Sequence, residues 1–184
     1  MIDKIKSENE TERQIMEDPE WQTGAAWGMP REGHPEGQVI YHIEEVLNNI
    51  DKLGVLSEER TKLRFIGLIH DTFKHRVDIT QPRVGSNNHA VIARKFAEKF
   101  TNDAAILDII ELHDEAFNAW RKGHETGKWD KAGERLRQLL DRVGSNIRLY
   151  YLFYTCDNET GDKDQECLRR FEKELGERGI LHFD

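Results

Sequence analysis

Cysteine and long apolar runs are scarce in this sequence, and each scarcity excludes a class of protein. Only two cysteines occur among the 184 residues, Cys156 and Cys167, and they have no CxxC spacing. A disulfide framework is therefore excluded, and a reducing, cytoplasmic setting is expected. No apolar run approaches the length that crosses a bilayer, and the first 21 residues are charged throughout. We expect a soluble protein with no membrane partner.

Clustered basic residues are also lacking. The formal net charge is −8, whereas proteins that hold long nucleic acids present a basic surface that releases counterions. A few basic residues near the middle of the chain can still form a local positive pocket: Lys74, Arg76, Arg83, Arg94 and Lys95. The expected partner is a small phosphorylated molecule rather than a long nucleic acid.

Strand-like alternation is nearly absent, and helical periodicity takes its place. Apolar residues from Val39 to Leu53 recur at intervals of three and four and stop at Gly54, which predicts a helix. Further helices are predicted from Ser57 to about His70 and over 88–100, 103–121, 129–143, 146–157 and about 164–175. Glycine and proline indicate loops at 23–37, 78–88 and 158–164. The sequence predicts one all-α domain over residues 1–184, with residues 1–20 as a charged helix or arm on its surface.

The segment FIGLIHDTFKH, residues 65–75, is apolar until it ends in His70 and Asp71, with Lys74 three residues further on. Burying an ionised carboxylate costs several kcal/mol unless a cation compensates. Imidazoles and carboxylates on facing helices are how helical proteins assemble a metal centre. The side chains at comparable positions on other predicted helices are His42, His89, His113 and Asp157.

A simpler interpretation competes for every histidine. Taken singly, a histidine on an apolar helix face is more often a hydrogen-bonded core residue than a ligand. His75, His124 and His182 are assigned to that simpler role. Beside the adjacent His70 and Asp71, the joint set favours a metal centre.

The order of these residues resembles a known family. His42, the pair His70 and Asp71, and Asp157 match the H…HD…D signature of the HD superfamily of metal-dependent phosphohydrolases, and HDTFK has its HD-x-x-K form. More narrowly, GHPEGQVIYH, HDTFKH and ELHD are similar to the HD domain of bacterial tRNA nucleotidyltransferases. The resemblance covers about residues 33–157 and implies an all-α HD-domain helical bundle with a metal centre between helices.

The resemblance also implies roles for single residues. One divalent ion would be held by His42, His70, Asp71 and Asp157, with Asp71 bridging to a second ion that His89 and His113 also hold. One or two ions are expected, and Mn, Mg, Co, Ni, Zn and Fe all remain open. Asp71 would also orient the attacking water, and Lys74 would neutralise phosphate oxygens.

Substrate contacts are expected from three positions. Lys74 lies close to Asp71, His34 precedes the first strong helix, and Arg83 lies in a glycine-flanked loop. His34 is equally consistent with a role in fixing its loop. Trp27 is expected to cover the core, because aromatic side chains usually mark packing.

The leading functional hypothesis is a metal-dependent phosphohydrolase for a nucleotide or another small phosphate ester, either a monoester or a cyclic diester. An HD-fold di-iron oxygenase is the alternative, because it uses a similar six-ligand set. A non-catalytic module that binds a metal and a nucleotide is the further alternative. The sequence leaves the oligomeric state open, and a dimer is compatible with it.

Overall fold

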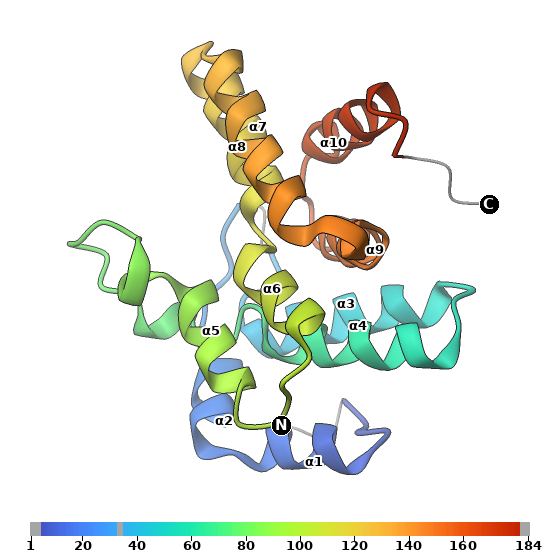
Figure 1. Ribbon diagram of the computed structural model, residues 1–184. Helices are drawn as coiled ribbons and strands as arrows, with labels where there is room; N and C mark the ends of the chain where they lie inside the picture. Colours follow the sequence, from blue (N-terminus) through green and yellow to red (C-terminus); the bar gives the residue numbers. More distant parts are fainter. Residues whose placement is uncertain (1–4, 33–34, 181–184) are drawn as a thin grey trace.

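The computed structural model describes residues 5–32 and 35–180, and Figure 1 shows helices packed around a shared centre. None of the described residues forms a strand, so the all-α prediction is confirmed. No helix among these residues has the length and apolar character that crossing a bilayer requires. The helices are α1 Glu10–Glu17, α2 Pro19–Ala25, α3 Val39–Lys52, α4 Ser57–Ile69, α5 His89–Ala97, α6 Ala104–Leu112, α7 Glu115–Thr126, α8 Trp129–Val143, α9 Ile147–Asn158 and α10 Glu166–Glu177.

Helices α3 and α4 form the antiparallel pair that carries the first site residues (Figure 1). The apolar positions that predicted α3 are buried, including Ile43, Val46 and Ile50. Gly67 of α4 faces this stripe, and a Cβ at that position would lie 3.3 Å from both Val46 Cγ1 and Leu47 Cδ2. Even a methyl group at this position would be tight against these two side chains, so Gly67 favours the close approach of α4 to α3.

The N-terminal helices are packed more deeply than the expected surface arm. Ile15 of α1 and Trp21 of α2 are fully buried in the core. The indole N–H of Trp21 donates to the carbonyl oxygen of Leu68 at 2.7 Å. A Cβ at Gly24 would lie 1.8 Å from the carbonyl oxygen of Thr72, so α2 presses directly on the turn that follows α4. Residues 10–25 therefore support the segment that carries His70 and Asp71.

The single helix expected over 103–121 is wrong, because the chain breaks into α6 and α7 at His113 and Asp114. The buried hydroxyl of Tyr150, from α9, lies in the break. It accepts a hydrogen bond from the Ala116 N–H at 3.2 Å and lies 3.1 Å from the carbonyl oxygen of Leu112 and 3.2 Å from that of His113. Breaking a helix leaves backbone donors and acceptors that need hydrogen-bond partners, and the Tyr150 hydroxyl is such a partner.

The remaining helices follow the sequence prediction closely. Helix α8 has the predicted bounds, and α9 and α10 lie within two residues of theirs. Helices α7 and α8 form an antiparallel pair that projects from the bundle, with α10 packed against α7 (Figure 1). The fold thus places the start of α7 beside the ends of α4, α6 and α9.

Candidate metal centre

The structure brings all six predicted ligand residues together at the ends of helices. His42 lies in the first turns of α3, His70 follows α4, His89 opens α5, His113 follows α6 and Asp157 lies near the end of α9. Every one of these side chains except His89 belongs to a buried residue, and His89 is half-buried. Asp71 lies between two groups of these side chains, one with His42 and His70 and the other with His89 and His113.

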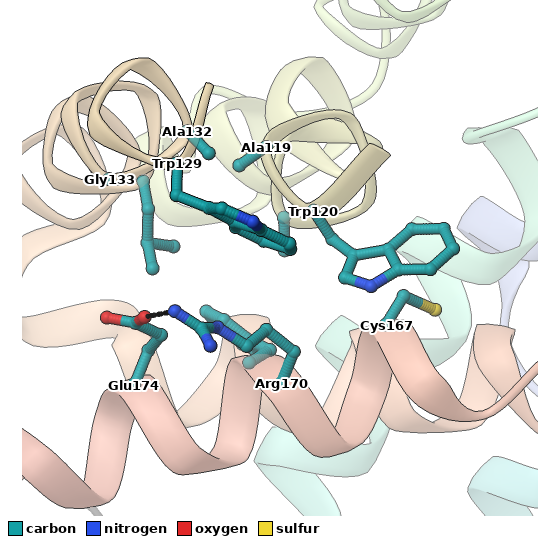
Figure 2. A pocket seen from close by; sticks show the side chains of 11 residues that line it. Ala119, Trp120, Trp129, Ala132, Gly133, Cys167, Arg170 and Glu174 are labelled. Carbon is teal, nitrogen blue, oxygen red and sulfur yellow. Dashed lines mark hydrogen bonds and ion pairs between the residues drawn. The ribbon is translucent and has the colours of Figure 1, made fainter. Parts of the chain in front are cut away.

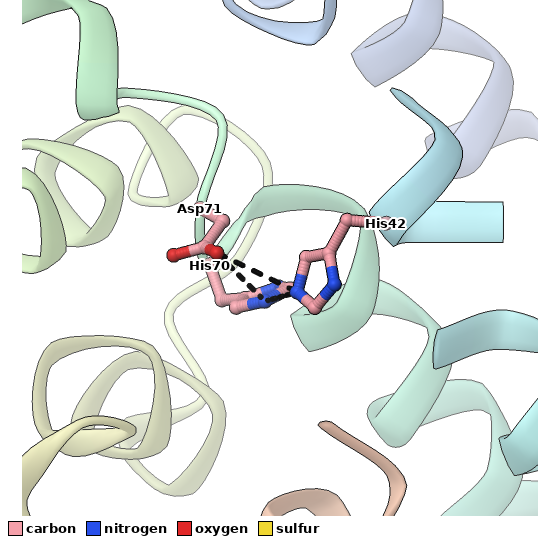
Figure 3. Close-up of side chains that lie close together, drawn as sticks. All are labelled: His42, His70 and Asp71. Carbon is pink, nitrogen blue, oxygen red and sulfur yellow. Dashed lines mark hydrogen bonds and ion pairs between the residues drawn. The ribbon is translucent and has the colours of Figure 1, made fainter. Parts of the chain in front are cut away.

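The first cluster consists of His42, His70, Asp157 and the Oδ2 atom of Asp71. His42 Nε2 lies 3.1 Å from His70 Nε2, 3.0 Å from Asp157 Oδ1 and 3.5 Å from Asp71 Oδ2. His70 Nε2 lies 3.7 Å from each of the two carboxylate oxygens. Figure 3 shows the imidazoles of His42 and His70 meeting the Asp71 carboxylate.

The second cluster consists of His89, His113, Asp114 and the Oδ1 atom of Asp71. The two imidazole Nε2 atoms lie 3.3 Å apart. Asp71 Oδ1 lies 3.3 Å from His89 Nε2 and 3.4 Å from His113 Nε2. Asp114 adds its carboxylate oxygens at 3.5 Å from His89 and 3.6 Å from His113. Asp71 therefore faces one cluster with each carboxylate oxygen.

Backbone carbonyls fix the orientation of two imidazoles. His70 Nδ1 donates to the carbonyl oxygen of Gly67 at 3.0 Å, and His113 Nδ1 donates to that of Ile110 at 2.8 Å. When the ring is neutral, as a metal ligand must be, each bond holds the proton on Nδ1 and leaves the Nε2 lone pair directed into its cluster. Glu36 lies behind His42, with Oε1 3.8 Å from its Nδ1. All three contacts are of the kind that orients metal-binding histidines in proteins.

Charge pairing inside the site shifts several pKa values. Burial opposes ionisation of Asp71, but Lys74 and the surrounding histidines hold its pKa well below the usual range. Burial lowers the pKa of His42 to about 4 against the opposing effect of Asp157, so this imidazole is neutral at pH 7. Burial also disfavours protonation of His113, but Asp114 and Asp71 outweigh it and raise its pKa to about 9.

Two lysines contact the same carboxylates. Lys74 Nζ forms a short ion pair with Asp71 Oδ2. Lys163 Nζ lies 2.9 Å from Asp157 Oδ1 and 2.8 Å from the Asp157 carbonyl oxygen. Burial opposes ionisation of Asp157, but Lys163 and the histidines of the first cluster lower its pKa well below the usual range. The carboxylates thus stay ionised because cations surround them.

The donor set suits divalent metal ions. At bond lengths of about 2.1 Å, two ligand atoms on one ion lie roughly 3.0–3.4 Å apart, and the closest contacts in both clusters fall in that range. Asp71 Oδ1 is buried and accepts no hydrogen bond from the residues that the structure describes. Mixed imidazole and carboxylate donors fit Mn, Fe, Co, Ni or Zn. Both clusters are therefore compatible with divalent metal binding.

A cavity of about 490 Å³ adjoins the clusters. Asp71, Asp114 and Asp157 border it together with Lys74 and Lys163. A volume of this size matches sites that hold small molecules rather than a single ion. A small molecule in the cavity has access to the carboxylates and to both ammonium groups.

Three other residues named in the sequence analysis have different outcomes. His34 lies outside the described residues, so its role stays a prediction. Arg83 is exposed in the loop before α5 and does not line the cavity beside the clusters, so its substrate contact also stays a prediction. The core position expected for Trp27 is wrong. It lies in the segment between α2 and α3 and is 41% exposed, and its backbone carbonyl accepts a hydrogen bond from Val39 N–H at 2.9 Å.

Asp114, Lys163 and Glu36 also contact the clusters, although the sequence patterns predict no role for them. Asp114 was visible in principle, because ELHD repeats the pattern of IGLIHD, an apolar helix that ends in histidine and aspartate. Lys163 lies in a polar loop that carries no such pattern. Glu36 follows a proline and precedes a glycine, and only its contact with His42 shows its relevance.

Residues 39–145 match the family model of the HD domain, which covers more than half of the chain. The chain belongs to the HD domain family. No curated protein and no solved structure matches it. The expected resemblance to the HD superfamily is therefore confirmed, while the narrower likeness to tRNA nucleotidyltransferases stays a prediction. The HD domain match includes five of the six predicted ligand residues and ends before Asp157 and Lys163.

Proposed function

We propose that this HD domain protein is a metal-dependent phosphohydrolase acting on a nucleotide or another small phosphate ester, a monoester or a cyclic diester. The observation that supports it most is the position of Asp71, whose two oxygens face separate imidazole pairs at 3.3–3.7 Å. HD domain proteins are in general metal-dependent phosphohydrolases. The six predicted ligands are the proposed metal-binding residues, and Asp114 completes the second cluster.

A divalent ion held by these residues would make hydroxide available at neutral pH, because coordination lowers the pKa of water from 15.7 toward about 7. The residues of this chain do the rest. His42 stays neutral and presents a lone pair, since burial keeps its pKa at about 4. Asp71 spans both clusters and orients the attacking water. Lys74 borders the cavity beside Asp71 and pairs with phosphate oxygens of the substrate.

Lys163 gives a second cation next to the cavity. Two ammonium groups beside the clusters favour an anionic substrate over a neutral polyol. This observation ranks hydrolysis of a phosphate ester above oxidation of a polyol by a di-iron oxygenase. The two ammonium groups do not distinguish hydrolysis of a phosphate ester from oxidation of a phosphonate. Analysis of the bound metal distinguishes these two reactions.

The decisive experiment combines elemental analysis with a screen of phosphate esters. The protein is purified without added metal, and turnover is measured with manganese, cobalt, nickel, zinc or magnesium. Asp71→Ala is expected to abolish metal retention and hydrolysis together, whereas Asp130→Ala, on the exposed face of α8, changes neither. Bound iron with oxygen consumption would instead identify an oxygenase. Metal retention without turnover of any ester would favour the non-catalytic module.

A further inference from the structure

The cavity beside the clusters extends to a wall that the proposed chemistry does not use. Phe117 and Trp120 of α7 line it, one helical turn apart, with ring centroids 5.7 Å from each other. Asp114, at the start of the same helix, belongs to the second cluster. At about 1.5 Å per residue, Trp120 lies roughly 9 Å from Asp114 along the helix axis. Phe117 lies roughly 4.5 Å from Asp114 along the same axis, so the aromatic wall extends from about 4.5 to about 9 Å beyond the start of α7.

The indole of Trp120 is held in place by its neighbours. Its ring stacks with the imidazole of His124 at 4.8 Å between centroids and 19° between planes. Figure 2 shows Trp120 directed toward Cys167 of α10, whereas Trp129 lies over the Arg170 side chain. Trp120 borders the cavity and Trp129 does not. The two tryptophans, close in space, therefore form a matched pair for experiments.

The loop between α9 and α10 gives the cavity an acidic rim. Asp162 and Asp164 both line it and flank Lys163 in the sequence. Both side chains are exposed to solvent at the edge of the cavity. Carboxylates accept hydrogen bonds from hydroxyl and amino groups, and they repel further phosphate groups.

From this arrangement we propose that the cavity selects nucleoside monophosphates, and that Trp120 and the rim residues Asp162 and Asp164 determine this specificity. The proposal rests on the phosphohydrolase function proposed above. The single phosphate lies at Lys74 and the clusters, the base stacks on Trp120, and the rim excludes the additional phosphates of a triphosphate.

The kinetic test compares adenosine 5′-monophosphate, adenosine 5′-triphosphate and glycerol 2-phosphate, which has no ring. Stacking of a base on an aromatic side chain contributes a factor of about 5 to 150 in affinity. Trp120→Ala is therefore expected to raise KM for the monophosphate by about that factor and to leave kcat/KM for glycerol 2-phosphate within about twofold. Trp120→Phe is expected to retain most of the affinity that Trp120→Ala loses. Trp129→Ala is expected to change the KM values of the monophosphate and of glycerol 2-phosphate alike.

The rim is tested by changing Asp162 and Asp164 together to asparagine, which preserves the hydrogen bond from Glu166 N–H to Asp164 Oδ1 at the start of α10. The preference for monophosphate over triphosphate is expected to shrink by about tenfold, since two like charges are removed. An unchanged preference would overturn the role of the rim.

A binding measurement separates this proposal from the proposed function. Adenosine, which has no phosphate, is expected to quench the tryptophan fluorescence of the metal-free protein and of the Trp129→Phe variant. The fluorescence of the Trp120→Phe variant is expected to be quenched much less. If glycerol 2-phosphate is hydrolysed while Trp120 variants show neither effect, the specificity proposal fails and the phosphohydrolase stands. If adenosine binds at Trp120 but no ester is hydrolysed with any metal, the phosphohydrolase fails and the subsite stands.

Discussion

Tyr150→Phe removes one oxygen atom from the break between α6 and α7, and it tests whether that break holds the second cluster in place. The hydroxyl accepts one hydrogen bond from Ala116 N–H at 3.2 Å and reaches the carbonyl oxygens of Leu112 at 3.1 Å and His113 at 3.2 Å. One accepted and one donated bond are lost. At about 0.5–1.5 kcal/mol each, the free energy of unfolding is expected to fall by about 1–3 kcal/mol.

The same substitution is expected to act on metal affinity at one cluster only. Of the residues whose backbone the hydroxyl contacts, His113 is a proposed metal ligand, and removing a contact behind a ligand typically changes metal affinity by about 10- to 100-fold. Calorimetric titration of the metal-free variant should show one ion weakened by about this factor and the other unchanged. Urea unfolding of the same samples gives the stability change.

Tyr151→Phe is the matched control. Its hydroxyl donates to Glu172 Oε1 at 2.9 Å, on α10, so removing it costs this half-buried bond and leaves both clusters intact. An unchanged free energy of unfolding for Tyr150→Phe, or an equal loss of affinity for both ions, would refute the role of Tyr150 in holding the second cluster.

Further predictions concern support of the site. Gly24→Ala places a Cβ 1.8 Å from a backbone carbonyl of the turn after α4 and should destabilise by about 1–3 kcal/mol in urea, whereas Gly133→Ala, in open space on α8, should not destabilise. Glu12→Ala removes the buried carboxylate that pairs with Arg64 at 2.9 Å and leaves the guanidinium with the more exposed Glu8 and Asp51, so urea unfolding should show a loss of about 1.5–3 kcal/mol; an effect below about 1 kcal/mol would contradict the role of this pair. Protonated His113 stabilises the metal-free protein fully below pH 6.5, and this contribution is lost as pH rises through about 9; His113→Gln should flatten that fall.

Local patterns predicted most of the helices, because each depends on neighbours along the chain. The stripe from Val39 to Ile50 predicted α3, and the bounds of α8 were correct. The break at His113 was missed, since Ile106 to Trp120 carries apolar residues at continuous helical spacing. The Tyr150 hydroxyl that fills the break comes from 34 residues further along the chain, and no local pattern contains it.

The candidate site was predictable only where residue type and order carried the information. Histidine and aspartate at the ends of apolar helices identified the six residues that the structure brings together. Lys163 and Glu36 were not predicted, because they lie in polar loops, where charged residues are common. Only their distances to Asp157 and His42 show that they belong to the site. Trp27 was misplaced because its position depends on how the chain turns after α2, a tertiary property.

We propose that Asp71 contributes one oxygen to a divalent ion in each cluster, and a crystal structure of the protein grown with manganese, with anomalous scattering to locate the metal, tests this most directly. The claim predicts two ions about 3.5–4 Å apart, one contacting His42 and His70, the other His89 and His113, with one oxygen of Asp71 on each. A single ion bound away from Asp71, or no ion at these side chains at saturating manganese, would contradict it.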